Sequence, residues 1–159
     1  MPIVLFRVDE RLIHGQVVVG WGSKLRPDRY VVVDAILATS EWEQELYMLG
    51  VPERASAEFL APEPARENLS SWRESDLRSV LLTRDLGTML ELARGGSMDG
   101  EEVNLGGLHS RKGREEVLPY LFLDESDRIM LEELGKEGVG ISAQNLPGAH
   151  KVNLASLLD

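Results

Sequence analysis

The residues best suited to chemistry lie together in segment 7–16, which has the sequence Arg-Val-Asp-Glu-Arg-Leu-Ile-His-Gly-Gln. It contains two arginines, an aspartate and a histidine: Arg7, Arg11, Asp9 and His14. An imidazole nitrogen can accept a phosphoryl group covalently, which divides one transfer into two easier ones. Guanidinium groups can bind the oxygens of that group through several planar donors. The segment therefore predicts an anion or phosphate site with His14 as the candidate nucleophile.

Neighbouring residues suit the same chemistry. Asp9 could hold the proton of one ring nitrogen of His14 and leave the other free to attack. A helix predicted to begin near Gly15 would add backbone N–H groups and the positive end of its dipole. Glycine also lets the backbone approach a ligand closely, so Gly15 and Gln16 are candidate phosphate-binding residues. A simple alternative stays open, in which Arg7 and Asp9 form a surface ion pair worth at most about 1 kcal/mol.

Short apolar runs alternate with helical patterns along the chain, which predicts an α/β fold. Several runs are continuously apolar, as expected for strands whose two faces are both covered. We predict one domain over residues 1–159, with an open, mostly parallel sheet of about seven strands and helices on both faces. The candidate strands are residues 3–6, 30–33, 57–60, 79–82, 102–105, 118–123 and 140–143.

Helices are predicted between these strands from apolar stripes and capping residues. One stripe follows Gly15, and Ser40 with Glu43 has the capping-box pattern. Residues 62–75 could be a helix or partly loop. In open α/β sheets, ligands bind where strands end and helices begin, and segment 7–16 is the first such junction. The remaining helix signals are Val17, Val18, Trp21 and Leu25 in the first stripe, Leu46, Met48 and Leu49 after Ser40, Asp85 before Leu86 with Gly95 as a stop, and Asp124 or Ser126 with Gly138 as a stop.

The composition narrows the possible functions. The 159 residues include 27 acidic and 17 basic side chains, for a formal charge of -10, which opposes broad binding to nucleic acid or anionic membranes. The chain has no cysteine, so disulfides and thiolate chemistry are excluded. We identify neither a signal peptide nor an apolar run of about 18 residues, and we expect a cytoplasmic protein. Any anion site must therefore be local.

Other motifs in the sequence do not predict a nucleotide or metal site. Gly95 and Gly100 have the spacing of a P-loop, but Glu101 and Glu102 follow where that motif needs Lys and Ser or Thr. The three histidines, His14, His109 and His150, are too scattered to predict a zinc site. We predict no metal and no cofactor. Three tryptophans, Trp21, Trp42 and Trp72, are expected to be core or interface anchors. The abundance of tryptophan and apolar residues near helix faces favours a possible homo-oligomer.

Residues 7–17, Arg-Val-Asp-Glu-Arg-Leu-Ile-His-Gly-Gln-Val, followed by Trp21, resemble the active loop of mannose/sorbose-type IIB components of the bacterial sugar phosphotransferase system. A second resemblance lies in the segment Asn-Leu-Gly-Gly at 104–107, with Gly113 beyond it. A third is Gly-Val at 138–139, with Gln144 and Pro147. Together these matches cover nearly the whole chain.

The resemblance implies a single α/β domain with a largely parallel, seven-stranded sheet. It implies that His14 accepts the phosphoryl group through Nδ1, that Arg7 and Arg11 bind and transfer it, and that Asp9 is the loop acid. The donor would be a phosphohistidine on a IIA partner, and the acceptor a sugar held by membrane IIC and IID subunits. The reaction would need no metal.

One segment departs from the family pattern and keeps other functions open. The apolar residues 35–38 follow Asp34, where the family usually has acidic and polar residues. The chain could therefore be a regulatory phospho-acceptor that retains the His14 loop without serving transport. A third possibility is a nucleotide- or anion-binding module without covalent chemistry. The roles of Asp34, Arg84 and His109 are left open by the sequence.

Overall fold

A seven-stranded sheet forms the middle layer of the computed structural model, which describes residues 2–158. Its strand order is β3-β2-β4-β1-β5-β8-β9, and every neighbouring pair is parallel except β8–β9. The prediction of an open, mostly parallel α/β sheet is confirmed. The strands are β1 (Ile3–Val8), β2 (Arg29–Val33), β3 (Ser56–Leu60), β4 (Ser79–Thr83), β5 (Glu102–Leu105), β8 (Gly140–Ala143) and β9 (Val152–Asn153).

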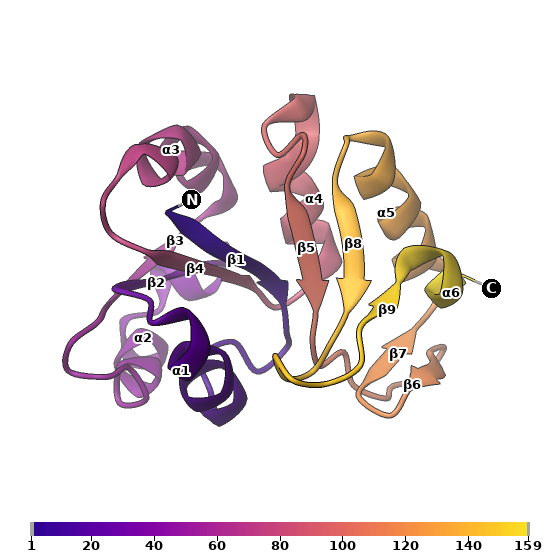
Figure 1. Ribbon diagram of the computed structural model, residues 1–159, viewed down its shortest axis with the longest axis horizontal. Coiled ribbons are helices and arrows are strands. Elements are labelled where there is room, and N and C mark those ends of the chain that lie inside the picture. The colour runs from indigo at the N-terminus through magenta and orange to yellow at the C-terminus, as the bar shows by residue number, and fades with distance from the viewer. Residues whose placement is uncertain (1, 159) are drawn as a thin grey trace.

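Helices cover both faces of the sheet because its strands are apolar on both sides. In β2, Val31 and Val33 face the larger core, whereas Tyr30 and Val32 face the smaller one. Figure 1 shows α1 and α2 beside the strands β1 and β2, while α4 and α5 lie behind β5 and β8. The helical segments are η1 (Gln16–Trp21), α1 (Gly22–Leu25), η2 (Leu37–Thr39), α2 (Glu41–Met48), α3 (Pro62–Glu74), α4 (Leu86–Ala93), η3 (Arg94–Gly96), α5 (Glu125–Lys136) and α6 (Leu154–Leu158).

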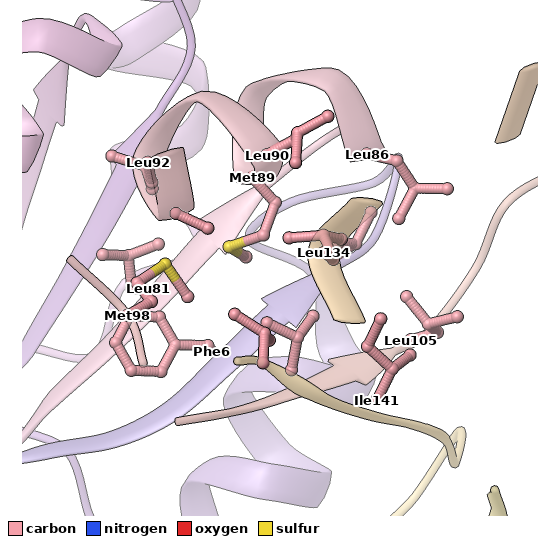
Figure 2. Close-up of a cluster of buried hydrophobic side chains, with 14 of the residues drawn as sticks. Phe6, Leu81, Leu86, Met89, Leu90, Leu92, Met98, Leu105, Leu134 and Ile141 are labelled. Atoms are coloured by element: carbon pink, nitrogen blue, oxygen red, sulfur yellow. The ribbon is translucent and has the colours of Figure 1, made fainter. Parts of the chain in front are cut away.

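The larger core lies under α3, α4 and α5. Figure 2 shows Met89 of α4 and Leu134 of α5 gathered over Phe6 of β1 and Ile141 of β8. All four side chains are at most 6% exposed, and burial of each stabilises the fold by roughly 1.5–3 kcal/mol. This core holds the central strands rigidly, so the loops at their ends start from fixed positions.

The predicted caps are confirmed for two of the helices. The Asp85 side chain accepts a hydrogen bond from the Thr88 N–H at the start of α4. Asp124 and Asp127 form a reciprocal capping box at the start of α5. Ser40 precedes α2 as predicted, but its side chain forms no capping hydrogen bond, so the predicted capping box is wrong. Residues 62–74, which the sequence left open, form α3 with a proline in its first turn, where proline is favoured.

Two other predictions need correction. Residues 118–123 do not form one strand of the main sheet: β6 (Glu115–Leu118) and β7 (Leu121–Leu123) form a separate antiparallel hairpin. The seventh strand of the sheet is β9, which is only two residues long. The helix predicted after Gly15 exists, but its first six residues form a π-helix, η1, before α1 begins.

The carboxyl ends of the central strands meet at one edge of the sheet (Figure 1). Val8 at the end of β1 pairs with Thr83 of β4 on one side and Leu105 of β5 on the other. The chain continues this alignment beyond the strands, because the Asp9 N–H donates to the Thr83 carbonyl at 2.9 Å. This edge therefore receives segment 7–16. No helix within residues 2–158 has the length and apolar character needed to cross a membrane.

Candidate active site

The loop that carries His14 is fixed by its own backbone and by one buried leucine. The Leu12 N–H donates to the Asp9 carbonyl at 3.0 Å, and the Glu10 N–H donates to the Gly107 carbonyl at 2.8 Å. Leu12 has a φ of 56°, a left-handed conformation that costs a residue with a side chain about 1–3 kcal/mol. Its side chain is fully buried in the smaller core, which offsets that cost. The loop is therefore held in one conformation.

Asp9 contacts the three other candidate catalytic residues of the site. Its carboxylate is fully buried and lies 3.2 Å from Arg7 Nη2. Arg11 donates to it from the backbone N–H at 3.0 Å and from Nε and Nη2 at 3.2 Å each. The Nε2 atom of His14 lies 3.1 Å from Asp9 Oδ2. One carboxylate thus joins the two arginines and the histidine that the sequence placed in this segment.

Asp9 is ionised in this environment. Burial alone would raise the pKa of the Asp9 carboxyl, but hydrogen bonds from His14 and Arg11 and the charge of Arg7 hold that pKa far below its usual value. Burial also lowers the pKa of the Arg7 guanidinium, and Asp9 opposes that effect. An ionised carboxylate can only accept hydrogen bonds, so the proton between Asp9 and His14 must belong to His14 Nε2.

His14 is partly exposed, and only one of its ring nitrogens has a hydrogen-bond partner among the residues that the structure describes. With the proton on Nε2, the lone pair of the neutral imidazole is on Nδ1. This atom forms no hydrogen bond within residues 2–158, and the side chain is 16% exposed. The carbonyl of His14 accepts from the Val17 and Val18 N–H groups, so η1 begins directly after the ring.

Arg11 and Gln16 contact each other beside the Asp9 carboxylate. The Arg11 side chain is 35% exposed, and its Nη2 donates to Gln16 Oε1 at 2.8 Å. Gln16 therefore uses its amide oxygen to hold Arg11. Gly15 is exposed, and a side-chain carbon built there would meet no atom within 4 Å. Its right-handed helical conformation does not require glycine, so neither backbone strain nor packing explains the glycine at this position.

Arg7, which the family resemblance led us to expect as a phosphoryl-binding residue, is buried. Its side chain is fully buried and donates to Asn104 Oδ1, to the Gln144 carbonyl at 2.9 Å and to the Asn145 carbonyl at 3.1 Å. The guanidinium also lies over the Trp21 ring, with its central carbon 5.3 Å from the ring centroid. Both terminal nitrogens of Arg7 are engaged in these contacts and with Asp9, so Arg7 ties the loop to β5 and to the segment after β8.

Gly106 and Gly107, in the second segment that resembles the family, allow this arrangement because they have no side chains. A carbon built at Gly106 would collide with the Arg7 guanidinium and with Asp9 Oδ2. A carbon at Gly107 would lie 3.3 Å from Arg11 Nη2. The two glycines therefore make room for the buried ion pairs, and the tight turn expected here has a packing function.

A second ion-pair cluster, which the sequence did not reveal, supports the loop from the other side. Glu10 Oε1 accepts from Arg114 Nη1 at 2.6 Å and from the His109 N–H at 3.0 Å. Arg114 is nearly buried and also pairs with Asp127 of α5 at 3.1 Å. His109 is half exposed, but a carbon built at Gly107 would lie only 3.2 Å from its Nε2, so His109 borders the site. These residues are about a hundred positions from Glu10, and no spacing rule links them.

Asp34 and Arg84, whose roles were open, pair with each other. Asp34 Oδ1 lies 3.0 Å from Arg84 Nε, and Asp34 Oδ2 accepts from the Leu37 N–H at 2.9 Å. They shape the turn that contains η2 and share no hydrogen bond with His14 or Asp9 among the residues placed by the structure. Within residues 2–158, no group of three or more His, Cys, Asp or Glu side chains is arranged to hold a metal ion.

Comparison with known proteins assigns this site to a family. N-acetylgalactosamine-specific phosphotransferase enzyme IIB component 1 of Escherichia coli K12 is 30% identical over 152 residues, which are 94% of each chain. The mannose-specific EIIAB component of E. coli K12 is 25% identical, and the match covers 99% of this chain but 49% of that protein.

A solved structure agrees with the sequence comparisons. The IIB domain of the sorbose permease from Klebsiella pneumoniae superimposes with a TM-score of 0.87 at 25% identity, covering 99% of this chain and 96% of that one. The model of the family described as PTS system sorbose subfamily IIB component matches residues 3–159. The resemblance found in segment 7–16 is confirmed, and the chain belongs to the sorbose subfamily of IIB components of the sugar phosphotransferase system.

Proposed function

We propose that the chain relays a phosphoryl group through His14 Nδ1, from a phosphohistidine on a IIA partner to a sugar at membrane IIC and IID subunits. The observation that carries the proposal is the hydrogen bond of His14 Nε2 to a buried, ionised Asp9. It leaves Nδ1 without a hydrogen-bond partner within residues 2–158, on a side chain that is partly exposed. Arg11, which shares Asp9 with His14, supplies a partly exposed guanidinium in the same loop.

The proposed step is a direct exchange of one N–P bond for another. The Nδ1 lone pair of His14 attacks phosphorus as the bond to the donor imidazole breaks, and no proton needs to leave His14. Asp9 stabilises the positive charge that the ring gains, while Arg11 binds the phosphoryl oxygens. In the second step, a sugar hydroxyl displaces His14 and its proton passes to a base at the sugar site.

The partners are inferred from the relatives. The mannose-specific EIIAB component contains a match to this chain in about half of its length, and its name pairs the IIB function with IIA. We infer that a IIA protein is the donor and that the relay works on the cytoplasmic side of the membrane. The matched relatives are named as sugar-specific components, which favours transport over a purely regulatory phospho-acceptor.

Phosphorylation of the purified chain by a phosphorylated IIA protein tests the proposal. We expect a mass increase of one phosphoryl group that is lost in acid and retained in alkali. His14→Ala should abolish the increase, while His150→Ala, an exposed residue outside the site, should retain it. Labelling that persists in His14→Ala would refute the proposed nucleophile.

A further inference from the structure

An apolar stripe on α2 faces outward. Trp42, Leu46 and Leu49 are spaced so that they share one side of the helix and its final turn. They are 66%, 57% and 84% exposed, and none of the residues of α2 is buried. An amphipathic helix normally turns such a stripe toward the core. We call these three residues the α2 patch.

The α2 patch adjoins the loop that carries His14. A groove of about 390 Å³ lies between them and is lined by Ile13, Trp42, Glu43, Leu46, Tyr47 and Gly50. Ile13 directly precedes His14, and its side chain lies 3.6 Å from where a carbon on Gly50 would stand. A protein that covers the α2 patch would therefore stand next to the phosphoryl acceptor. Exposed apolar surface beside a reactive group indicates a binding surface for another protein.

The charge around the patch indicates the chemistry of that partner. Three acidic residues, Glu41, Glu43 and Glu45, are on α2 itself, and this helix has no lysine or arginine. A complementary surface would have an apolar centre and a basic rim. Cytoplasmic loops of membrane proteins have such an excess of lysine and arginine.

We propose that the α2 patch docks on the cytoplasmic loops of the membrane IIC and IID subunits and so directs His14 toward the bound sugar. This inference rests on the proposed function and adds the surface that serves the second transfer. The acidic rim also lets the chain approach basic loops while its overall charge keeps it away from the anionic lipid surface. The IIA donor would then use other surfaces around the loop.

Binding of the unphosphorylated chain to inverted membrane vesicles tests the inference. The vesicles come from the bacterium that encodes this chain, with and without deletion of its IIC and IID genes. We expect saturable binding only with both subunits present, weakened about tenfold or more by Trp42→Ser or Leu46→Ser and weakened by salt. The matched control is Ile129→Ser, which removes a 49% exposed apolar side chain from α5 and should bind normally.

Phosphorylation by the IIA donor tests whether the α2 patch binds the membrane subunits or a different partner. Phosphorylation by the IIA protein should proceed at an unchanged rate in Trp42→Ser and Leu46→Ser, whose exposed positions leave the fold intact. Vesicle binding unaffected by these substitutions would overturn the inference. So would a parallel loss of donor labelling, or a patch-dependent dimer in sedimentation. A chain whose His14 is never labelled would refute the relay, but vesicle binding would still be measurable.

Discussion

At the scale of single residues, the site depends on one buried carboxylate. Asp9 accepts hydrogen bonds from Arg7, Arg11 and His14, and each of these groups depends on it differently. Arg7 needs a counter-charge because its guanidinium is fully buried. In the proposed relay, His14 needs Asp9 to fix the proton on Nε2, so that Nδ1 can act as the nucleophile. Orientation and charge balance thus come from the same two oxygen atoms.

Asp9→Asn tests the contribution of the Asp9 charge apart from that of its packing. The substitution keeps the shape of the side chain but leaves Arg7 buried without a counter-charge, which typically costs about 3–5 kcal/mol. We expect that loss in the free energy of unfolding, measured by urea titration at neutral pH, together with loss of labelling at His14. A variant that stays as stable as the parent would show that Arg7 finds its compensation in Asn104 and the loop carbonyls.

The cost of Asp9→Asn should also depend on pH. The pKa of Asp9 is lowered in the folded state, so its carboxylate contributes stability above the unfolded pKa of about 3.9. That contribution is lost as the pH falls below this value toward the folded pKa. The difference in unfolding free energy between the two proteins should therefore be largest near neutrality and shrink in acid. A constant difference down to pH of about 3 would contradict the assignment.

At the scale of elements, the site exists because β1 and β5 run side by side and end together. Their pairing brings Gly106 against the Arg7–Asp9 ion pair, where no side chain fits. We predict that Gly106→Ala lowers the free energy of unfolding by about 1–3 kcal/mol and slows labelling of His14, because the new methyl group displaces both partners. Gly148→Ala, where a side-chain carbon meets nothing within 4 Å, is the matched control and should be nearly neutral.

The local part of the site could be predicted from sequence, whereas the long-range part could not. Residues 7–16 are contiguous, so the proximity of Arg11, Asp9 and His14 followed from the chain itself. Whether Arg7 faces solvent or the interior depends on Asn104 and on the carbonyls after β8, which only the folded sheet brings near. The Glu10–Arg114 pair was missed for the same reason.

The errors in the fold have local physical causes. The interior strands at 102–105 and 140–143 were predicted with their observed bounds because both faces of each are covered. The run 118–123 is apolar throughout, but the chain turns at Pro119, which cannot donate to a sheet. The strand β9 is too short to show a pattern. For α2, the apolar spacing correctly predicted a helix but gave no indication that the apolar side would face outward.

At the scale of the whole molecule, the proposed relay adds an anionic group to a chain with a net charge of -10. At physiological ionic strength, interactions between exposed charges are largely screened beyond about 8 Å. The distant acidic residues therefore oppose the phosphoryl group only weakly. Arg11 is in the same loop as His14 and shares Asp9 with it, so we expect it to bind the phosphoryl oxygens directly. Local attraction should outweigh the overall repulsion.

Phosphorylation should therefore stabilise the folded chain, with Arg11 as the cause. A charge-assisted hydrogen bond contributes about 1.5–3 kcal/mol, and the partial exposure of Arg11 reduces this, so we expect a gain of about 1 kcal/mol in the free energy of unfolding. Urea titration of phosphorylated and unphosphorylated protein in mild alkali measures it. Arg11→Ala should abolish the gain and slow labelling by about 100-fold. Because it also removes two hydrogen bonds to Asp9, the unphosphorylated chain should lose about 1 kcal/mol of stability. Arg54→Ala, which removes an exposed arginine from another loop, should keep both the gain and the labelling rate. An equal gain in Arg11→Ala would show that the backbone of η1 alone holds the phosphoryl group.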